Sequence, residues 1–267
     1  MKATLIISVY KNVTDLKVVL DALQYQTEKN FEIIISEDGE SEIIADFVGN
    51  YSSEFKIRHL SQPDAGWLKN KALNRAVKAA NTPYLIFIDA DCVLHHRFIE
   101  NHLYFAADRR VLAGKRVKLG PRFSDILRNK PLLQFENGFI ANTFALFRDK
   151  VKFFEEGIYV SPKSLLSILV KQRKISSIKG CNFSCFKQAM FDINGFDEDY
   201  IKPAVGEDAD LDWRFKGLGY EVMPVRNYAI QYHLFHKENW TTQEDNLNMM
   251  RQKQAQKTFR CENGLEK

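Results

Sequence analysis

The stretch Tyr84-Leu85-Ile86-Phe87-Ile88-Asp89-Ala90-Asp91-Cys92 decides the fold prediction, because it joins five consecutive apolar or aromatic residues to two carboxylates. An apolar run of this length predicts a strand that is buried on both faces, as in a parallel sheet. The two acids then stand where the strand leaves the sheet. A strand end can direct two carboxylates at one hard divalent cation, which prefers oxygen ligands, and at the phosphates that the cation bridges.

Three more strands are expected before this one, with helical segments between them. The expected strands are Leu5–Val9, Phe31–Ser36 and Lys56–Leu60, and the expected helices begin at Thr14 or Asp15, begin at Ser41, and span Leu68–Ala80. This alternation predicts a mostly parallel, doubly wound α/β sheet. Ligands of such sheets sit beyond the carboxyl ends of the strands, so the first binding candidates are Tyr10, Asp38 and the Asp89–Asp91 turn.

A second ordered block follows Gly180, after a basic and aromatic stretch, residues 109–179, whose elements the pattern does not assign. The block is expected to contain strand Asn182–Phe186, helix Lys187–Ile193, a turn at Asn194-Gly195, helix Glu207–Lys216 closed by Gly217 or Gly219, and strand Glu221–Val225. The chain therefore reads as α/β over most of its length.

The helix expected at residue 207 begins with four acids within six residues, which are Glu207, Asp208, Asp210 and Asp212. The helix dipole favours negative charge at this end, so helix capping alone accounts for two of them. A further carboxylate can accept a proton from an attacking hydroxyl that lies within hydrogen-bond reach. Asp212 shares the helix face of Asp208, but pairing with Arg214 or Lys216 is an equal alternative for it.

Two histidines, His233 and His236, follow the acidic helix. An imidazole there can complete a metal site that is otherwise built from oxygen donors, and a mixed nitrogen and oxygen set suits manganese better than calcium. The competing interpretation is an ordinary surface or core histidine. The pattern does not decide which of the two histidines is the ligand.

The overall composition excludes several classes of protein. The 267 residues are 45% apolar with a formal charge of +4 and a pI near 8.7, which predicts a globular protein and no nucleic-acid partner. The apolar run at the N-terminus is too short for a signal peptide or a membrane span. The four cysteines form no C-x-x-C pair, which favours a reducing, cytoplasmic location.

Membrane contact, if present, is expected to be peripheral. The segment Leu165–Val170 is apolar and is followed by Lys171, Arg173 and Lys174, in a stretch without acids. Such a segment can lie on the anionic inner face of a membrane, where lipid-linked acceptors are found. A packed helix with a solvated basic end is the equal alternative.

With these clusters in this order, the chain resembles the family 2 glycosyltransferases of GT-A fold, in particular the bacterial capsule and chondroitin polymerase group and the animal galactosyltransferases. The resemblance is carried by Gly180-Cys-Asn-Phe-Ser-Cys-Phe-Lys187, Phe191-Asp-Ile-Asn-Gly-Phe-Asp-Glu-Asp-Tyr200 and Gly206-Glu-Asp-Ala-Asp-Leu211. It implies a Rossmann-like, mostly parallel central sheet flanked by helices. It also implies one continuous domain, with a nucleotide-sugar half over residues 1–110 and a smaller acceptor-binding and catalytic half over residues 111–267.

The resemblance also assigns roles to single residues. Residues expected to contact the nucleotide or its diphosphate are Tyr10, Asp38, Lys69, Lys71, Asp89 and Lys237. Residues expected to hold the metal, Mn²⁺ or Mg²⁺, are Asp89, Asp91 and His233. Asp208 matches the catalytic base and Glu207 an acceptor-site partner. One departure concerns the acceptor pocket, because Lys202-Pro-Ala-Val-Gly206 stands where many relatives carry G-W-G.

The implied reaction is the inverting, metal-dependent transfer of a hexose or N-acetylhexosamine from a nucleoside-diphosphate sugar, with UDP favoured, to a hydroxyl of a glycan or lipid-linked saccharide. The implied setting is synthesis of a bacterial surface polysaccharide, such as capsule or lipopolysaccharide. A phosphatase of the haloacid dehalogenase type remains an alternative, since Asp89-Ala-Asp91-Cys-Val93 fits its D-x-D-x-[TV] motif. A non-catalytic carbohydrate-binding protein is a second alternative. No G-x-G-x-x-G follows the first strand, which disfavours a dinucleotide dehydrogenase.

Overall fold

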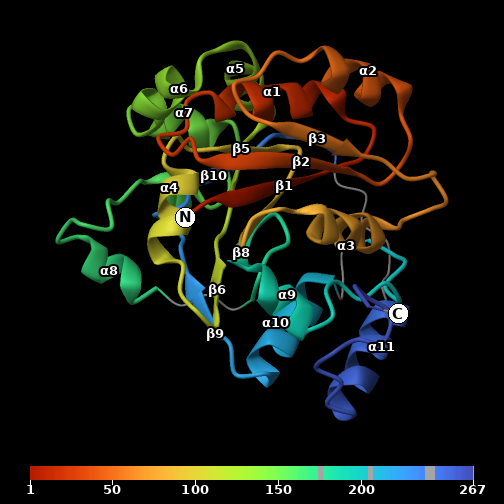
Figure 1. The fold of residues 1–267 in the computed structure, drawn as a ribbon. Helices are drawn as coiled ribbons and strands as arrows, with labels where there is room; N and C mark the ends of the chain where they lie inside the picture. The colour runs from red at the N-terminus through yellow and green to blue at the C-terminus, as the bar shows by residue number, and fades with distance from the viewer. Residues whose placement is uncertain (174–176, 204–206, 238–243, 267) are drawn as a thin grey trace.

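Four parallel strands from the first third of the chain form one side of the central sheet (Figure 1). They are β1 (Ala3–Val9), β2 (Phe31–Glu37), β3 (Ile57–Leu60) and β4 (Tyr84–Asp89). The structure is a computed structural model that describes residues 1–173, 177–203, 207–237 and 244–266. The four strands confirm the predicted parallel β-α-β order, with ends that differ from the expected ones by at most two residues.

The second part of the chain extends the same sheet. The strands β8 (Asn182–Phe186), β6 (Arg110–Ala113) and β9 (Glu221–Pro224) join beside β4, so the order is β3-β2-β1-β4-β8-β6-β9. β8 runs antiparallel to both of its neighbours, and β6 and β9 run parallel to each other. The sheet is therefore mixed, and it continues across the expected boundary at residue 110.

Helices cover both faces of the sheet, as Figure 1 shows with α1 and α2 above it and α3, α9 and α10 below it. The helices packed on the first face are α1 (Val13–Leu23), α2 (Glu42–Asn50) and α4 (Phe98–Phe105), and those on the second are α3 (Lys69–Ala79), α9 (Lys187–Asp192) and α10 (Glu207–Gly217). Successive side chains of a strand point to opposite faces, so Leu5 and Ile7 enter one core and Ile6 the other. Both faces are apolar because both are covered.

The first helix begins earlier than the sequence pattern indicates. We expected Thr14 or Asp15 to cap it, but the side chain of Asn12 accepts a hydrogen bond from the backbone N–H of Asp15 at 3.1 Å. The same Asn12 side chain donates to the Asp15 carboxylate at 2.9 Å. Asn12 therefore satisfies an otherwise unpaired N–H of the first turn, which is the role of an N-cap residue.

A small second sheet lies beside the carboxyl end of β4. It consists of β5 (Cys92–Leu94), β10 (Gln231–His233) and β7 (Val117–Lys118), in the order β5-β10-β7. β10 runs antiparallel to β5 and places His233 opposite Cys92. These strands have two or three residues each, too few for the sequence pattern to reveal them.

Apart from β6 and β7, the regular structure in the segment that the sequence left unassigned is helical. It forms α5 (Pro121–Asn129), α6 (Leu132–Phe139), α7 (Thr143–Arg148), a 3₁₀ turn (Phe154–Gly157) and α8 (Ser167–Lys171). Figure 1 shows α5, α6 and α7 grouped at one corner of the molecule and α8 projecting separately. A last helix, α11 (Glu244–Ala255), lies near the C-terminus.

The candidate membrane segment forms the short helix α8 and the turn before it. Leu165 is 88% exposed and Leu169 is 62% exposed, whereas Ser167 and Val170 are buried. Arg173 is bound to Glu156 at 3.1 Å, and Lys174 lies outside the described residues. In the described part of the chain, no helix has both the length and the apolar character needed to cross a bilayer.

Candidate active site

A cleft of about 640 Å³ opens beyond the carboxyl ends of β1, β2 and β4. Ligands of doubly wound sheets bind at this edge. The cleft is lined by Ser8, Val9, Tyr10, Asn12, Asp38, Gly66, Trp67, Lys69, Asp89, Ala90, Asp91 and His236. Six residues that the sequence singled out, from five separate segments, therefore meet in one cavity.

The far end of the cleft is formed by Tyr10 and Asp38. The Tyr10 ring is 53% exposed, and its hydroxyl donates to Asp64 at 3.3 Å. Asp38 is buried, and its carboxylate accepts hydrogen bonds from the Gln62 side chain and from the backbone N–H of Leu68, both at 2.8 Å. Asp38 thus anchors the start of α3, and the Tyr10 ring offers an exposed face to a planar ligand.

The middle of the cleft holds a cation beside Asp89. Lys69, in the first turn of α3, donates to the Asp89 carboxylate at 3.0 Å, and Arg116 lies 4.0 Å from its other oxygen. Lys71 is two residues further along the helix and exposed, and it does not line this cleft. The geometry therefore brings Lys69, and not Lys71, to the Asp-x-Asp turn.

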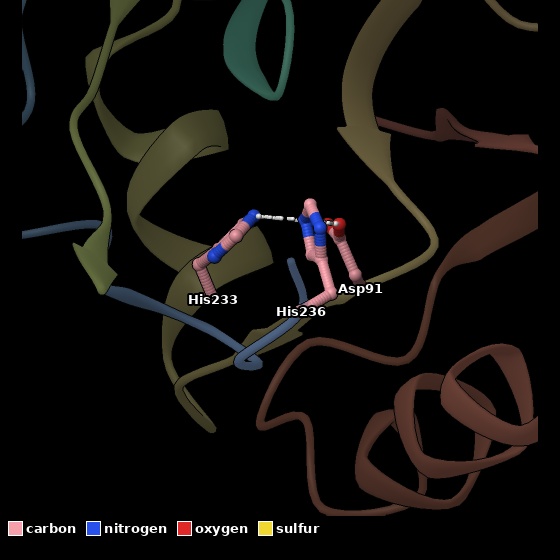
Figure 2. Close-up of side chains that lie close together, drawn as sticks. All are labelled: Asp91, His233 and His236. Carbon is pink, nitrogen blue, oxygen red and sulfur yellow. Dashed lines mark hydrogen bonds and ion pairs between the residues drawn. The ribbon is translucent and has the colours of Figure 1, made fainter. Parts of the chain in front are cut away.

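Asp91 meets two histidines, as Figure 2 shows. The pairing of β10 with β5 brings His233 beside Asp91, because the N–H of Leu234 donates to the Asp91 carbonyl at 2.9 Å. One Asp91 carboxylate oxygen is 3.3 Å from Nε2 of His233 and 3.2 Å from Nε2 of His236. The two Nε2 atoms are 3.2 Å apart, so three potential ligand atoms surround one point.

This spacing fits a divalent cation. Ligand atoms about 2.1 Å from an ion and at right angles to each other are separated by about 3.0 Å, close to the separations found here. The donor set of one carboxylate and two imidazoles suits manganese, as expected from the sequence. The sequence kept His233 and His236 as alternatives, and the structure brings both to Asp91, whereas Asp89 faces Lys69 and Arg116 instead.

The electrostatics of Asp91 agree with this arrangement. Burial by itself would raise the pKa of the Asp91 carboxyl, but the hydrogen bonds to His233 and His236 outweigh burial and hold the pKa well below its usual range. The carboxylate is therefore ionised at neutral pH, which is the form that binds a metal.

Asp208 approaches the same region from α10. Its carboxylate accepts a hydrogen bond from the backbone N–H of Gly180 at 2.8 Å. A side chain at position 180 would meet that oxygen at 2.5 Å, so only glycine allows this contact. Burial raises the pKa of Asp208, Lys69 lowers it, and Asp89 raises it further. Acids from two distant parts of the chain thus share one electrostatic environment, and a raised pKa suits a group that exchanges protons.

The other acids of α10 have structural partners. Asp210 is buried and binds Arg214 at 2.6 Å, and Asp212 binds Lys216 at 2.6 Å. Of the two interpretations of Asp212, the ion pair with Lys216 is therefore the one observed. The side chain of Glu207 and residues 204–206, which replace the G-W-G motif, lie outside the described residues.

A second cavity, of about 600 Å³, lies across the histidines from the first. It is lined by Lys118, Leu119, Gly120, Pro121, Arg148, Asp149, Lys150, Lys152, His233, Phe235, His236 and Lys237. His236 belongs to the walls of both cavities. Lys237, which we expected near the diphosphate, faces this second cavity. The sequence analysis did not predict this cavity. Four of its basic residues belong to the unassigned segment 109–179, whose basic character was the available indication.

Known proteins resemble this chain in sequence and in fold. The model of the family described as Glycosyl transferase family 2 matches residues 4–167. The chain is 26% identical over 102 residues to the validoxylamine A glucosyltransferase of Streptomyces hygroscopicus subsp. jinggangensis (38% of this chain, 24% of that protein). It is 23% identical over 236 residues to the chondroitin synthase of Escherichia coli (86% of this chain, 34% of that protein).

A solved structure, GalNAc-T7 with UDP, GalNAc and Mn²⁺, matches 94% of this chain and 48% of its own, with a TM-score of 0.64 and 11% sequence identity. The chain thus spans about a quarter to a half of the length of these three proteins. The structural likeness establishes the GT-A fold, as the sequence predicted.

Proposed function

The chain belongs to glycosyl transferase family 2, and we propose that it transfers a hexose or N-acetylhexosamine from a nucleoside-diphosphate sugar to a saccharide hydroxyl, with inversion at the anomeric carbon. The single observation that carries this proposal is that Asp89 and Asp91 line one cleft with Lys69 at the carboxyl edge of the sheet. Asp208, from a distant part of the chain, is close enough for the charges of Lys69 and Asp89 to shift its pKa. Membership of this family makes the chain a glycosyltransferase and disfavours both the phosphatase and the carbohydrate-binding alternatives.

The donor lies in the cleft along β1, β2 and β4. Its base stacks on the exposed face of Tyr10, near the buried carboxylate of Asp38. Lys69, held against Asp89 at 3.0 Å, contributes positive charge near the diphosphate. UDP is the proposed nucleotide, supported by the UDP complex of the similar GalNAc-T7 structure.

Asp91, His233 and His236 would hold a divalent cation, for which manganese is the proposed ion. When bound there, the cation would neutralise negative charge on the departing diphosphate. The three side chains are positioned before a cation binds. The small sheet and the loop after β10 fix the carboxylate and the two imidazoles within 3.3 Å of one another.

Asp208 acts as the general base of the transfer. The Gly180 amide fixes one carboxylate oxygen, and the carboxylate removes the proton from the attacking hydroxyl as the bond to the anomeric carbon forms. Because this is a single displacement on the face opposite the diphosphate, the configuration of the sugar inverts. Glu207 remains the proposed acceptor-site partner.

The proposed setting is the cytoplasmic side of a bacterial membrane, during synthesis of a surface polysaccharide. The E. coli relative is a chondroitin synthase, and a glycan or lipid-linked saccharide is the corresponding acceptor proposed for this chain.

The base assignment is tested by Asp208→Asn. We expect the release of nucleoside diphosphate from the donor, with water or a sugar as acceptor, to slow by about a hundredfold to ten-thousandfold. Donor binding, measured as thermal stabilisation by UDP with Mn²⁺, should persist. The matched control is Asp212→Asn on the same helix, whose carboxylate binds Lys216. Full turnover by Asp208→Asn would show that another group is the base.

A further inference from the structure

The second cavity is strongly basic. Among the residues that the structure describes, five cationic side chains line it, from Lys118, Arg148, Lys150, Lys152 and Lys237, against one acid, Asp149. The Asp149 carboxylate accepts hydrogen bonds from the backbone N–H groups of Arg122 and Phe123 at 3.1 Å and 2.8 Å, so its charge is directed at the start of α5. We call the five cationic residues the basic pocket.

Two of these cations have no acidic partner within the described parts of the chain. Lys150 and Lys152 are exposed, and no carboxylate described in the structure comes within ion-pair distance of either amine. By contrast, other cations of the middle segment are paired, since Arg110 binds Glu221 at 2.7 Å and Arg128 binds Asp15 at 2.9 Å. Concentrated, unpaired positive charge in a concave site favours an anionic ligand.

Exposed apolar side chains occur in the same chain segment as residues of the basic pocket. They belong to Ile140, Phe144, Phe147 and Phe153, which are 62%, 74%, 56% and 46% exposed. We call these four residues the aromatic face. The helix α7 carries both features, because the Arg148 guanidinium lies 5.2 Å over the Phe144 ring while Arg148 also lines the pocket. Figure 1 shows α6 and α7 at an outer corner of the fold.

We propose that the aromatic face and the basic pocket together dock the protein on a membrane surface, with the phosphate of a lipid in the basic pocket. Exposed aromatic side chains beside lysines and arginines suit the boundary between acyl chains and anionic headgroups. Because the basic pocket is positively charged, it favours the phosphate of a lipid over a neutral surface of a partner protein.

The position of the basic pocket connects docking to the reaction. His233 and His236 form part of its wall, and His236 also lines the donor cleft. A saccharide linked to the bound lipid phosphate is therefore held next to the transfer centre, and the acceptor belongs to the class of lipid-linked sugar phosphates. This step rests on the proposed function, whereas the docking itself does not.

Vesicle flotation tests the proposal. The full chain should float with vesicles of phosphatidylcholine mixed with phosphatidylglycerol, much less with phosphatidylcholine alone, and less at high salt. The double variants Phe144→Ser with Phe147→Ser and Lys150→Glu with Lys152→Glu should each lower vesicle partitioning by at least about tenfold. All four side chains are exposed, so the fold should persist.

The matched control is Leu165→Ser with Leu169→Ser, which removes equally exposed apolar side chains next to and within α8. It should float like the unchanged protein. Loss of flotation in this control alone, or absence of flotation in the unchanged chain, overturns the proposal. A dimer that the phenylalanine variant converts to monomer, without vesicle binding, would identify the aromatic face as a contact between two copies.

Two further measurements keep the outcomes distinct. A polarity-sensitive dye attached to Phe144→Cys should shift to shorter wavelength on vesicle binding, which reports docking without removing the basic charges. UDP with Mn²⁺ should stabilise both docking variants as it stabilises the unchanged chain. Vesicle binding without any nucleotide stabilisation would contradict the proposed donor site and leave membrane docking standing.

Discussion

Two groups of histidine and carboxylate side chains flank the three-residue strand β5, and they differ in what their polar atoms contact. Asp91 directly precedes β5 in the chain and meets His233 and His236, and this group borders the two cavities. His95 and His96 directly follow β5 and meet Glu136. Both groups have three potential metal ligands within 4.8 Å of one another. Ligand types and spacing alone therefore do not distinguish a metal site from a structural contact.

The group after β5 uses its polar atoms within the protein. One Glu136 oxygen accepts from the backbone N–H of His96 at 2.9 Å, and the other lies 2.5 Å from Nδ1 of His96. Nδ1 of His95 accepts from the N–H of Arg97 at 3.2 Å, and its ring stacks on Tyr159. These contacts fasten α6 to the end of β5. In the group around Asp91, the three potential ligand atoms instead face one another, and the group lines the two cavities.

The largest expected effect separates the two groups directly. Asp91→Ala should lower the rate of sugar transfer by about a thousandfold, since a metal contributes several kcal/mol to stabilising charge in the transition state. It should also abolish stabilisation of the protein by Mn²⁺ with UDP, followed by thermal unfolding. Retention of manganese-dependent activity in this variant would show that Asp89 or another acid is the ligand.

The two histidines can be compared with each other. His233→Ala and His236→Ala should each weaken Mn²⁺ binding, measured by titration calorimetry, by at least about tenfold to a hundredfold. His233 is buried in β10 and His236 is more exposed. We therefore expect the His233 variant to lose thermal stability as well. An unchanged Mn²⁺ affinity in His236→Ala would restrict the site to Asp91 and His233, as the sequence resemblance implied.

Glu136→Ala should have the opposite profile. It leaves the backbone N–H of His96 without its partner, so the free energy of unfolding should fall by about 1 to 3 kcal/mol. Affinity for Mn²⁺ with UDP, measured below the unfolding transition, should not change. A variant that unfolds normally but no longer binds manganese would make this group the metal centre and reverse the comparison.

The effect that is smallest at neutral pH is a change in acid sensitivity. Burial, with contributions from His96 and Arg97, lowers the pKa of His95 to about 3, so the folded state holds this ring neutral. The unfolded chain binds a proton near the ordinary histidine value. The stability contribution of His95 is therefore full above about pH 6.5 and is lost by about 1.4 kcal/mol per pH unit between about pH 6.5 and pH 3. His95→Asn should reduce this slope by that amount in denaturant titrations at several pH values.

His102 provides a check on that slope, because burial also lowers its pKa to about 3, in a separate contact with Ser184 and Asn182. The part of the pH dependence that His102 contributes should therefore remain in His95→Asn. A slope identical to that of the unchanged chain would show that His95 titrates alike in the folded and unfolded states.

Much of the fold was predictable because its signals are local. The strands β1, β2 and β4 are continuous apolar runs, and each ends in polar residues that line the cleft, so Tyr10, Asp38 and the Asp89–Asp91 turn could be named beforehand. The acids of α10 were recognisable as a cluster, but four adjacent carboxylates look alike in sequence. Burial and partners separate Asp208 from Asp210 and Asp212.

The amino-acid sequence by itself determined the α/β class, the family and the carboxylates at the strand ends, since these depend on periodicity and on motifs within a few residues. Only the tertiary structure decided which groups meet. The pairing of β10 with β5 joins residues about 140 positions apart through strands of three residues, and it brings His233 and His236 to Asp91. Such pairing is fixed by packing and backbone hydrogen bonds across the whole fold, which no local pattern encodes.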